Sequence, residues 1–182
     1  PGLFSRMAFA LALARASVVD ARTFTTVDGM ATSGFWVQDA NGGAYEPHEF
    51  HRLKRAVERA LSGDLSPRHA LAERRRATRR RERPFEPPTR ISFDNEASDL
   101  YTVIEVDTRD RFGLLYDLTS ALAAASINIH SAVIATYGEQ AVDVFYVKDL
   151  FGLKIRQKAK QEGIQRRLRA AIARAAADVD SA

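Results

Sequence analysis

Apolar and polar positions alternate along several short stretches of the chain. Residues 100–108 are rich in β-branched and aromatic side chains and run into a polar cluster, which predicts a strand followed by a turn. Residues 127–137 and 140–147 have the same character and are separated by Gly138 and Glu139. This spacing predicts a β-hairpin.

The apolar period changes between and after these stretches, and two helices are predicted there. One apolar stripe lies upstream of the hairpin, with Asp110 as its N-cap, and a second lies downstream with arginines and glutamines on its other side. The order is therefore β-α-β-β-α. The stripes consist of Leu115, Leu118, Leu122 and Ala125, and of Ile164, Leu168, Ala171, Ile172 and Ala175.

The first part of the chain repeats this unit. A shift of 111 positions places Gly2 and Leu3 on Gly113 and Leu114, and after a one-residue deletion residues 35–39 fall on 145–149. This collinearity indicates a domain duplication. The first copy is predicted to contain a helix carrying Phe4, Met7, Leu11 and Ala14, strands at residues 18–26 and 31–37, and a helix carrying Phe50, Leu53, Val57, Ala60 and Leu61.

These elements predict an α+β fold of two ferredoxin-like βαββαβ units, the first truncated at its N-terminus. The expected boundaries are a first domain at 1–64, an Arg/Pro-rich linker at 65–97 and a second domain at 98–182. Residues 89–93 are expected to supply a strand that completes the first unit. Units of this size are individually marginal, so the two copies are expected to pack against each other.

The amino-acid composition limits the cellular locations that are expected for the chain. It contains no cysteine, which excludes disulfides and thiolate chemistry and favours a cytoplasmic location. Residues 7–19 resemble the apolar core of a secretory signal, but Arg15 interrupts them, and no apolar run is long enough to span a membrane. We therefore expect no membrane partner.

The net charge of +4 is unevenly distributed. Eight arginines between Arg68 and Arg83 stand against Glu73 and Glu82, so this stretch carries +6 and the rest of the chain carries −2. No aromatic side chains interleave with the arginines. We expect a solvated helix or linker face with weak, salt-sensitive attraction for nucleic acid and no specific nucleic-acid partner.

No catalytic constellation is present in the sequence. There is no glycine-rich phosphate loop and no GxSxG elbow, and the four histidines are scattered without metal-ligand spacing. We therefore predict no catalytic residues, no metal ligands and no cofactor in this chain. The residues alone leave open whether the chain is part of an enzyme.

The most informative stretch is the turn formed by Asp110, Arg111, Phe112, Gly113 and Leu114, between the first strand and the first helix of the second copy. Gly113 allows close approach to the backbone, and the N–H groups that open a helix attract a carboxylate. Asn128 offers an amide donor and an acceptor. The alternative is purely structural: Gly113 eases a tight turn and Asn128 caps the entry to a strand.

This turn, together with residues 128–132 and 142–147, resembles an ACT domain, an amino-acid-sensing βαββαβ module. Residues 93–106 and 141–155 resemble more specifically the C-terminal tandem ACT region of the bifunctional uridylyltransferase and uridylyl-removing enzymes, which modify the nitrogen regulatory protein PII. The resemblance covers essentially the whole chain.

The resemblance implies a regulatory, glutamine-sensing role in nitrogen regulation, without catalysis in this chain. Upstream catalytic domains, which would use Mg²⁺, and PII are the implied partners. It carries over one ligand site made by Asp110, Arg111, Gly113 and Leu114, with Asn128 across from them. Phe112 stands where the family usually has proline, and Ser17 replaces the asparagine at the position that matches Asn128.

Two other functions remain open at this point. An RNA-recognition motif shares the βαββαβ fold, and the arginines could contact phosphates, although residues 141–147 contain Asp143 and lack glycine. The other alternative is an ACT dimerisation module that binds no ligand.

Overall fold

The computed structural model describes residues 2–25, 30–39, 41–63, 67, 70–71 and 88–180. The first copy comprises helix α1 (Leu3–Leu13), strands β1 (Ser17–Thr25) and β2 (Ala31–Gln38), the short 3₁₀ helix η1 (Pro47–Glu49) and helix α2 (Phe50–Ser62). The arginine-rich segment between Arg68 and Arg83 lies outside the described residues, except for Ala70 and Leu71.

The second copy has strand β4 (Thr102–Arg109), helix α4 (Leu114–Ala124), strands β5 (Ile127–Tyr137) and β6 (Gln140–Asp149) and helix α5 (Lys158–Asp180). Strand β3 (Arg90–Asp94) precedes it. The predicted order of helices and strands in both copies is confirmed, as is the α+β class. Gly138 turns the β5–β6 hairpin with a positive φ of 63°.

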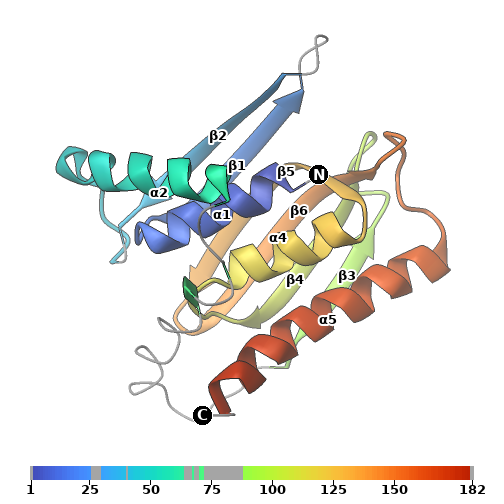
Figure 1. Ribbon diagram of the computed structural model, residues 1–182. Coiled ribbons are helices and arrows are strands. Elements are labelled where there is room, and N and C mark those ends of the chain that lie inside the picture. The colour runs from blue at the N-terminus through green and yellow to red at the C-terminus, as the bar shows by residue number, and fades with distance from the viewer. Residues whose placement is uncertain are drawn as a thin grey trace.

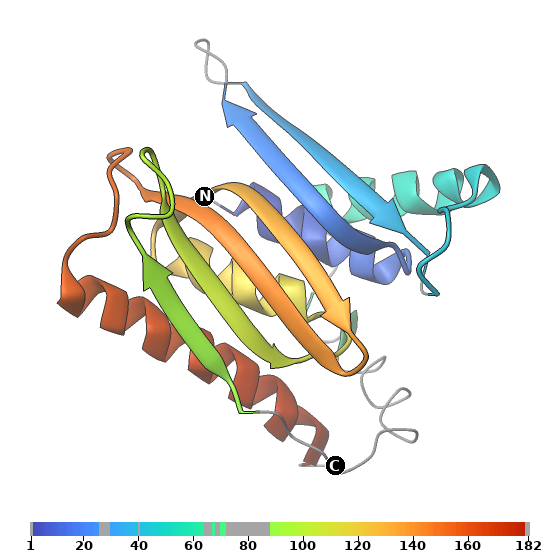
Figure 2. The same cartoon turned by 180° about the vertical axis from the view of Figure 1, so that it is seen from behind.

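All strands form one antiparallel sheet in the order β2-β1-β5-β6-β4-β3. The helices α2, α1, α4 and α5 lie side by side and cover one face of it (Figure 1). The opposite view shows the strands of the second copy without a helical cover (Figure 2). The molecule therefore has two layers, and helices α1 and α4 meet at the boundary between the copies.

The two copies join through β1 and β5 in a reciprocal manner. Ala21 pairs with Ala132, its equivalent under the 111-residue shift, and Asp20 pairs with Val133 while Arg22 pairs with Ser131. Because each pair is the image of another under that shift, a pseudo-twofold axis passes beside Ala21 and Ala132. The duplicated chain is thus arranged like a symmetric dimer, and the predicted packing of the copies against each other is confirmed.

The backbone repeats unusual conformations at equivalent positions. The φ of Gly2 is 102° and that of Gly113 is 76°, at the starts of α1 and α4. Arg15 and Ser126, which follow these helices, have φ of 59° and 61°, a region that non-glycine residues seldom occupy. The same strained turns in both copies support the duplication independently of side-chain identity.

Strand β3 corrects one prediction. The segment does form a strand, but it pairs with β4 at the far edge of the second copy's part of the sheet. Ile91 and Phe93 point into the core of the second copy, next to Val106 and Ile104. The prediction that residues 89–93 complete the first copy is therefore wrong, because their apolar face and the open edge of β4 lie in the second copy.

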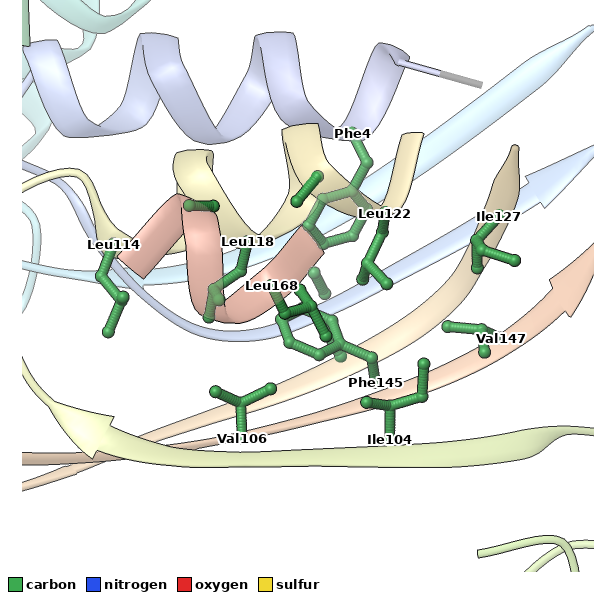
Figure 3. Close-up of a cluster of buried hydrophobic side chains, with 14 of the residues drawn as sticks. Phe4, Ile104, Val106, Leu114, Leu118, Leu122, Ile127, Phe145, Val147 and Leu168 are labelled. Atoms are coloured by element: carbon green, nitrogen blue, oxygen red, sulfur yellow. The ribbon is translucent and has the colours of Figure 1, made fainter. Parts of the chain in front are cut away.

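One main hydrophobic core extends under both copies (Figure 3). Phe145 and Leu118 are fully buried between the sheet and α4, and Phe4 of α1 packs in the same cluster. A smaller cluster of Phe9, Ala10, Ala60 and Leu71 joins α1 to α2. The shared core means that the copies stabilise each other.

Candidate functional site

The predicted ligand loop lies where β4 ends and α4 begins. Gly113, and not Asp110 as predicted, is the N-cap of α4. It has the left-handed conformation, and its carbonyl accepts a hydrogen bond from the N–H of Asp117 at 3.1 Å. Arg111 pairs through Nη1 with Oδ2 of Asp117 at 2.5 Å. The ion pair fixes the loop onto the first turn of the helix, whose N–H groups form the positive end of its dipole.

The loop borders a cavity of about 640 Å³, which we name the Gly113 cavity. The first copy supplies the opposite wall through the end of α1 and the start of β1, including Arg15 and Ser17. The site is therefore built by both copies. Its lining residues are Ala8, Ala12, Arg15, Ala16, Ser17, Val18, Asp110, Arg111, Phe112, Gly113, Leu114, Leu115, Tyr116, Ile134, Thr136, Ala141 and Asp143.

Asn128 does not lie in this cavity. It lines a second cavity of about 530 Å³, the Asn128 cavity, opposite Gly2 and Ser5 of the first copy. The structure thus brings together Asp110, Arg111, Gly113 and Leu114 but separates them from Asn128. The prediction of one site combining Gly113 with Asn128 is wrong.

Helix α4 causes this separation, because its 11 residues, about 16 Å of helix, lie between Gly113 and the start of β5, and the reciprocal packing of the copies decides what each end faces. Ser17 of the first copy is the equivalent of Asn128 and faces the Gly113 loop, while Asn128 faces the equivalent loop at Gly2. Each glycine helix start therefore meets the strand start of the other copy. Only the relative placement of the copies determines this exchange.

Asp143 is a second polar group of the Gly113 cavity, and the ligand-site prediction missed it. It lies on the helix-facing side of β6, where its strand neighbours on that face are Ala141 and Phe145, and it pairs across the sheet with Val106 and Ile134. Burial, with a further contribution from the negative charge of Asp110, raises the pKa of Asp143 to about 8. The sequence did contain a signal for it: Asp143 stands at a strand position whose alternation with its neighbours predicts an apolar side chain facing the core.

The same orientation of Asp143 bears on RNA binding. Asp143 points toward the helices, so it does not occupy the open sheet face on which RNA-recognition motifs stack bases. On that open face, Tyr101 stacks on His130 with ring centroids 4.5 Å apart, and Lys148 lies 5.0 Å from the centre of the Tyr101 ring. Asp143 is therefore no evidence against RNA binding.

Phe112 anchors the loop to the first copy. It is partly buried against the cluster of Phe9, Ala10, Ala60 and Leu71, beside Tyr116, whose ring centroid lies 5.6 Å from that of Phe9. Apolar packing thus constrains the loop at the position where the resembled family usually has proline.

Asp149 and His130, which line the Asn128 cavity, both have shifted pKa values. Asp149 Oδ1 accepts hydrogen bonds from the N–H groups of Phe151 and Leu153, both at 3.0 Å, and its Oδ2 pairs with Lys160 Nζ at 3.0 Å. The backbone bond from Leu153 and the bond from Lys160 lower the pKa of Asp149. Burial, aided by Lys148, lowers the pKa of His130.

The described residues contain no group of three His, Asp or Glu side chains that could hold a metal ion. Within the same described part of the chain, no helix has the length and apolar character required to cross a membrane.

Comparison with known proteins agrees with this architecture. Residues 90–177 match the family described as "ACR9-like, ACT-like domain". These residues form an ACT-like domain. The domain begins at β3 in this match, as it does in the sheet, where β3 pairs with β4.

The ACT-like domain and the preceding copy are together similar to bifunctional uridylyltransferase/uridylyl-removing enzymes. The chain is 58% identical over 172 residues to the enzymes of Cereibacter sphaeroides and Ruegeria pomeroyi, and 55% identical over 157 residues to that of Gluconobacter oxydans. These alignments cover 94%, 94% and 85% of the chain but only 18%, 19% and 16% of the relatives.

The predicted resemblance to this enzyme family is thereby confirmed, and the chain spans less than a fifth of the length of these relatives. No solved structure gives a significant match.

Proposed function

We propose that this chain is a regulatory module that senses glutamine at the interface between its two copies. The observation that supports this proposal is the reciprocal pair of cavities. In each cavity, the glycine at the start of a helix in one copy faces the start of a strand in the other copy. The similarity to bifunctional uridylyltransferase/uridylyl-removing enzymes supports glutamine as the ligand, because the resemblance implies that role. In this proposal the chain itself performs no catalysis.

The chemistry of the Gly113 cavity suits an amino acid. The N–H groups at the start of α4 and the guanidinium of Arg15 favour the ligand carboxylate. Asp110, Ser17 and Thr136 provide acceptors and hydroxyl groups on other walls of the cavity. Volumes of about 530 and 640 Å³ for the two cavities fall within the usual range of small-molecule sites.

A ligand held between the copies would carry a signal for a simple thermodynamic reason. It binds only when the copies are packed together, so it stabilises that arrangement in proportion to its concentration. The proposed recipients of this signal are upstream catalytic domains, which would need Mg²⁺ and act on PII. A cytoplasmic location belongs to the same proposal and agrees with the absence of cysteine.

The direct test is isothermal titration calorimetry of the whole chain with glutamine, after thermal unfolding has shown a cooperative transition. We expect saturable heat, with glutamate and asparagine binding more weakly. If the folded chain gives no heat with glutamine, the sensing proposal fails and the ligand-free dimerisation module becomes the better hypothesis.

Variants test the two cavities separately. Gly113→Val places a β-branched side chain at a φ of 76° and should abolish binding in the Gly113 cavity. Gly63→Val is the matched control, because its φ is 84° and it lies at the end of α2, outside the lining of both cavities. Unchanged glutamine binding by Gly113→Val would exclude this cavity.

Asn128→Ala should weaken binding in the Asn128 cavity by about 2- to 10-fold, since the exposed amide of Asn128 would contribute one hydrogen bond to the ligand. It should leave the Gly113 cavity unaffected, because Asn128 does not line it. A single binding event that both substitutions abolish would contradict the two-cavity arrangement.

A further inference from the structure

Asp143 is a buried carboxyl group on the helix-facing side of β6. Its exposed fraction is 1%, and Oδ1 has no hydrogen-bond partner among the described residues. A buried polar atom without a partner costs stability, so such atoms are rare in folded proteins and call for an explanation. Here the group lines the Gly113 cavity, which provides space for a missing partner.

The charged groups around Asp143 define what that partner must be. Asp110, from the loop before α4, adds negative charge and disfavours ionisation of Asp143. Arg111 is held by Asp117, and Arg15 lines the cavity from the end of α1 in the first copy. Two carboxyl groups on one side of a cavity favour a cationic hydrogen-bond donor there.

The end of the same loop, where α4 begins, favours the opposite charge. The first turn of α4 begins at Gly113 and presents the positive end of a helix. A ligand that satisfies both preferences carries an anion and a cation a short distance apart, which describes the carboxylate and ammonium groups of an α-amino acid.

We propose that Asp143 is the residue that binds the α-ammonium group of the ligand in the Gly113 cavity and thereby selects amino acids over other carboxylates. This inference rests on the proposed sensing function, and it specifies which group of the ligand Asp143 recognises. On binding, the neutral carboxyl group of Asp143 loses its proton to solvent, and the ligand ammonium donates a hydrogen bond to the resulting carboxylate. No bond other than this O–H bond is broken.

The two cavities differ in this respect. The first copy has Ser33 at the position equivalent to Asp143, and Ser33 exchanges a hydrogen bond with Thr23 at 3.1 Å. The carboxylate that lines the Asn128 cavity, Asp149, is already bound by Lys160. Proton release on binding is therefore expected from the Gly113 cavity alone.

The test is calorimetry at pH 7 in buffers of different ionisation enthalpy, with glutamine and with glutaramate, which lacks the α-amino group. Because the pKa of Asp143 is raised to about 8, binding of glutamine in the Gly113 cavity should release close to one proton. Glutaramate should bind there about 10- to 100-fold more weakly and release none.

Asp143→Asn should abolish the proton release and bring glutamine binding down to the level of glutaramate. Asp107→Asn is the matched control, because Asp107 faces the opposite side of the sheet, where its Oδ1 accepts a hydrogen bond from Gln140 Nε2 at 2.6 Å. It should leave both the affinity and the proton count unchanged.

The outcomes separate the two proposals. Glutamine binding without proton release in the unaltered chain overturns the role of Asp143 and leaves glutamine sensing intact, and this measurement needs no variant. Equal affinity for glutamine and glutaramate also overturns it. Complete absence of glutamine binding overturns the sensing function and this inference with it.

Discussion

At the scale of single residues, the burial of Asp143 makes the stability of the folded chain depend on pH. Its pKa is about 8 in the folded state against the ordinary aspartate value of 3.8, so the folded state holds a proton that the unfolded state loses between these values. The stabilising contribution of the neutral carboxyl is therefore complete below about pH 4 and is lost as the pH rises toward 8.

Asp143→Asn removes this dependence while preserving the shape of the side chain. We expect the melting temperature of the variant to exceed that of the unaltered chain more at about pH 8.5 than at about pH 5, since only the carboxyl ionises over this range. Differential scanning calorimetry at the two pH values measures the difference. An equal offset at both would show that Asp143 is ionised throughout.

At the scale of elements, substitutions in strand β3 test whether the segment before β4 packs in the core of the second copy. Ile91 is 9% exposed and packs in the main core, whereas Ser92 is exposed on the other face of the strand. Ile91→Ala should therefore reduce the free energy of unfolding by about 2–4 kcal/mol. Ser92→Ala should change it by less than about 0.5 kcal/mol.

Chemical denaturation measures both values. A negligible effect of Ile91→Ala would mean that β3 does not belong to the second copy's core.

The turns after β2 and β6 are equivalent and have the same hydrogen bonds, but the second turn has an additional ion pair. Asp39 Oδ1 accepts hydrogen bonds from Asn41 and Gly43, as Asp149 Oδ1 does from Phe151 and Leu153. In the second copy, Asp149 also pairs with Lys160 of α5. The duplicated turn is therefore tied to a helix in the second copy by an additional ion pair.

At the scale of the whole molecule, the pseudo-twofold interface holds both cavities together. Ala21 and Ala132 are fully buried where β1 meets β5, so a larger side chain at either position must displace packed neighbours. Ala132→Leu should cost about 1–3 kcal/mol through overpacking. It should also weaken glutamine binding in both cavities, because each cavity takes its walls from both copies.

Ala124→Leu is the matched control, since Ala124 is exposed on α4. It should preserve stability and binding. If Ala132→Leu disturbed only one of two glutamine-binding events, the cavities would not depend on a common interface.

The sequence by itself determined the elements and the duplication. Local apolar period and turn residues identified the helices and strands, and equivalent residues such as Gly2 and Gly113 revealed the repeat, because these signals depend on neighbours along the chain. The same signals identified the loop that ends at Leu114 as a candidate anion site.

The tertiary structure alone decided which surfaces face each other. It assigned β3 to the second copy, placed Asn128 opposite Gly2 rather than Gly113, and brought Asp143 into the Gly113 cavity. These pairings join residues far apart in sequence, and two copies with equivalent patterns offer more than one way to pair. The choice rests on side-chain packing across the β1–β5 boundary, which no local pattern encodes.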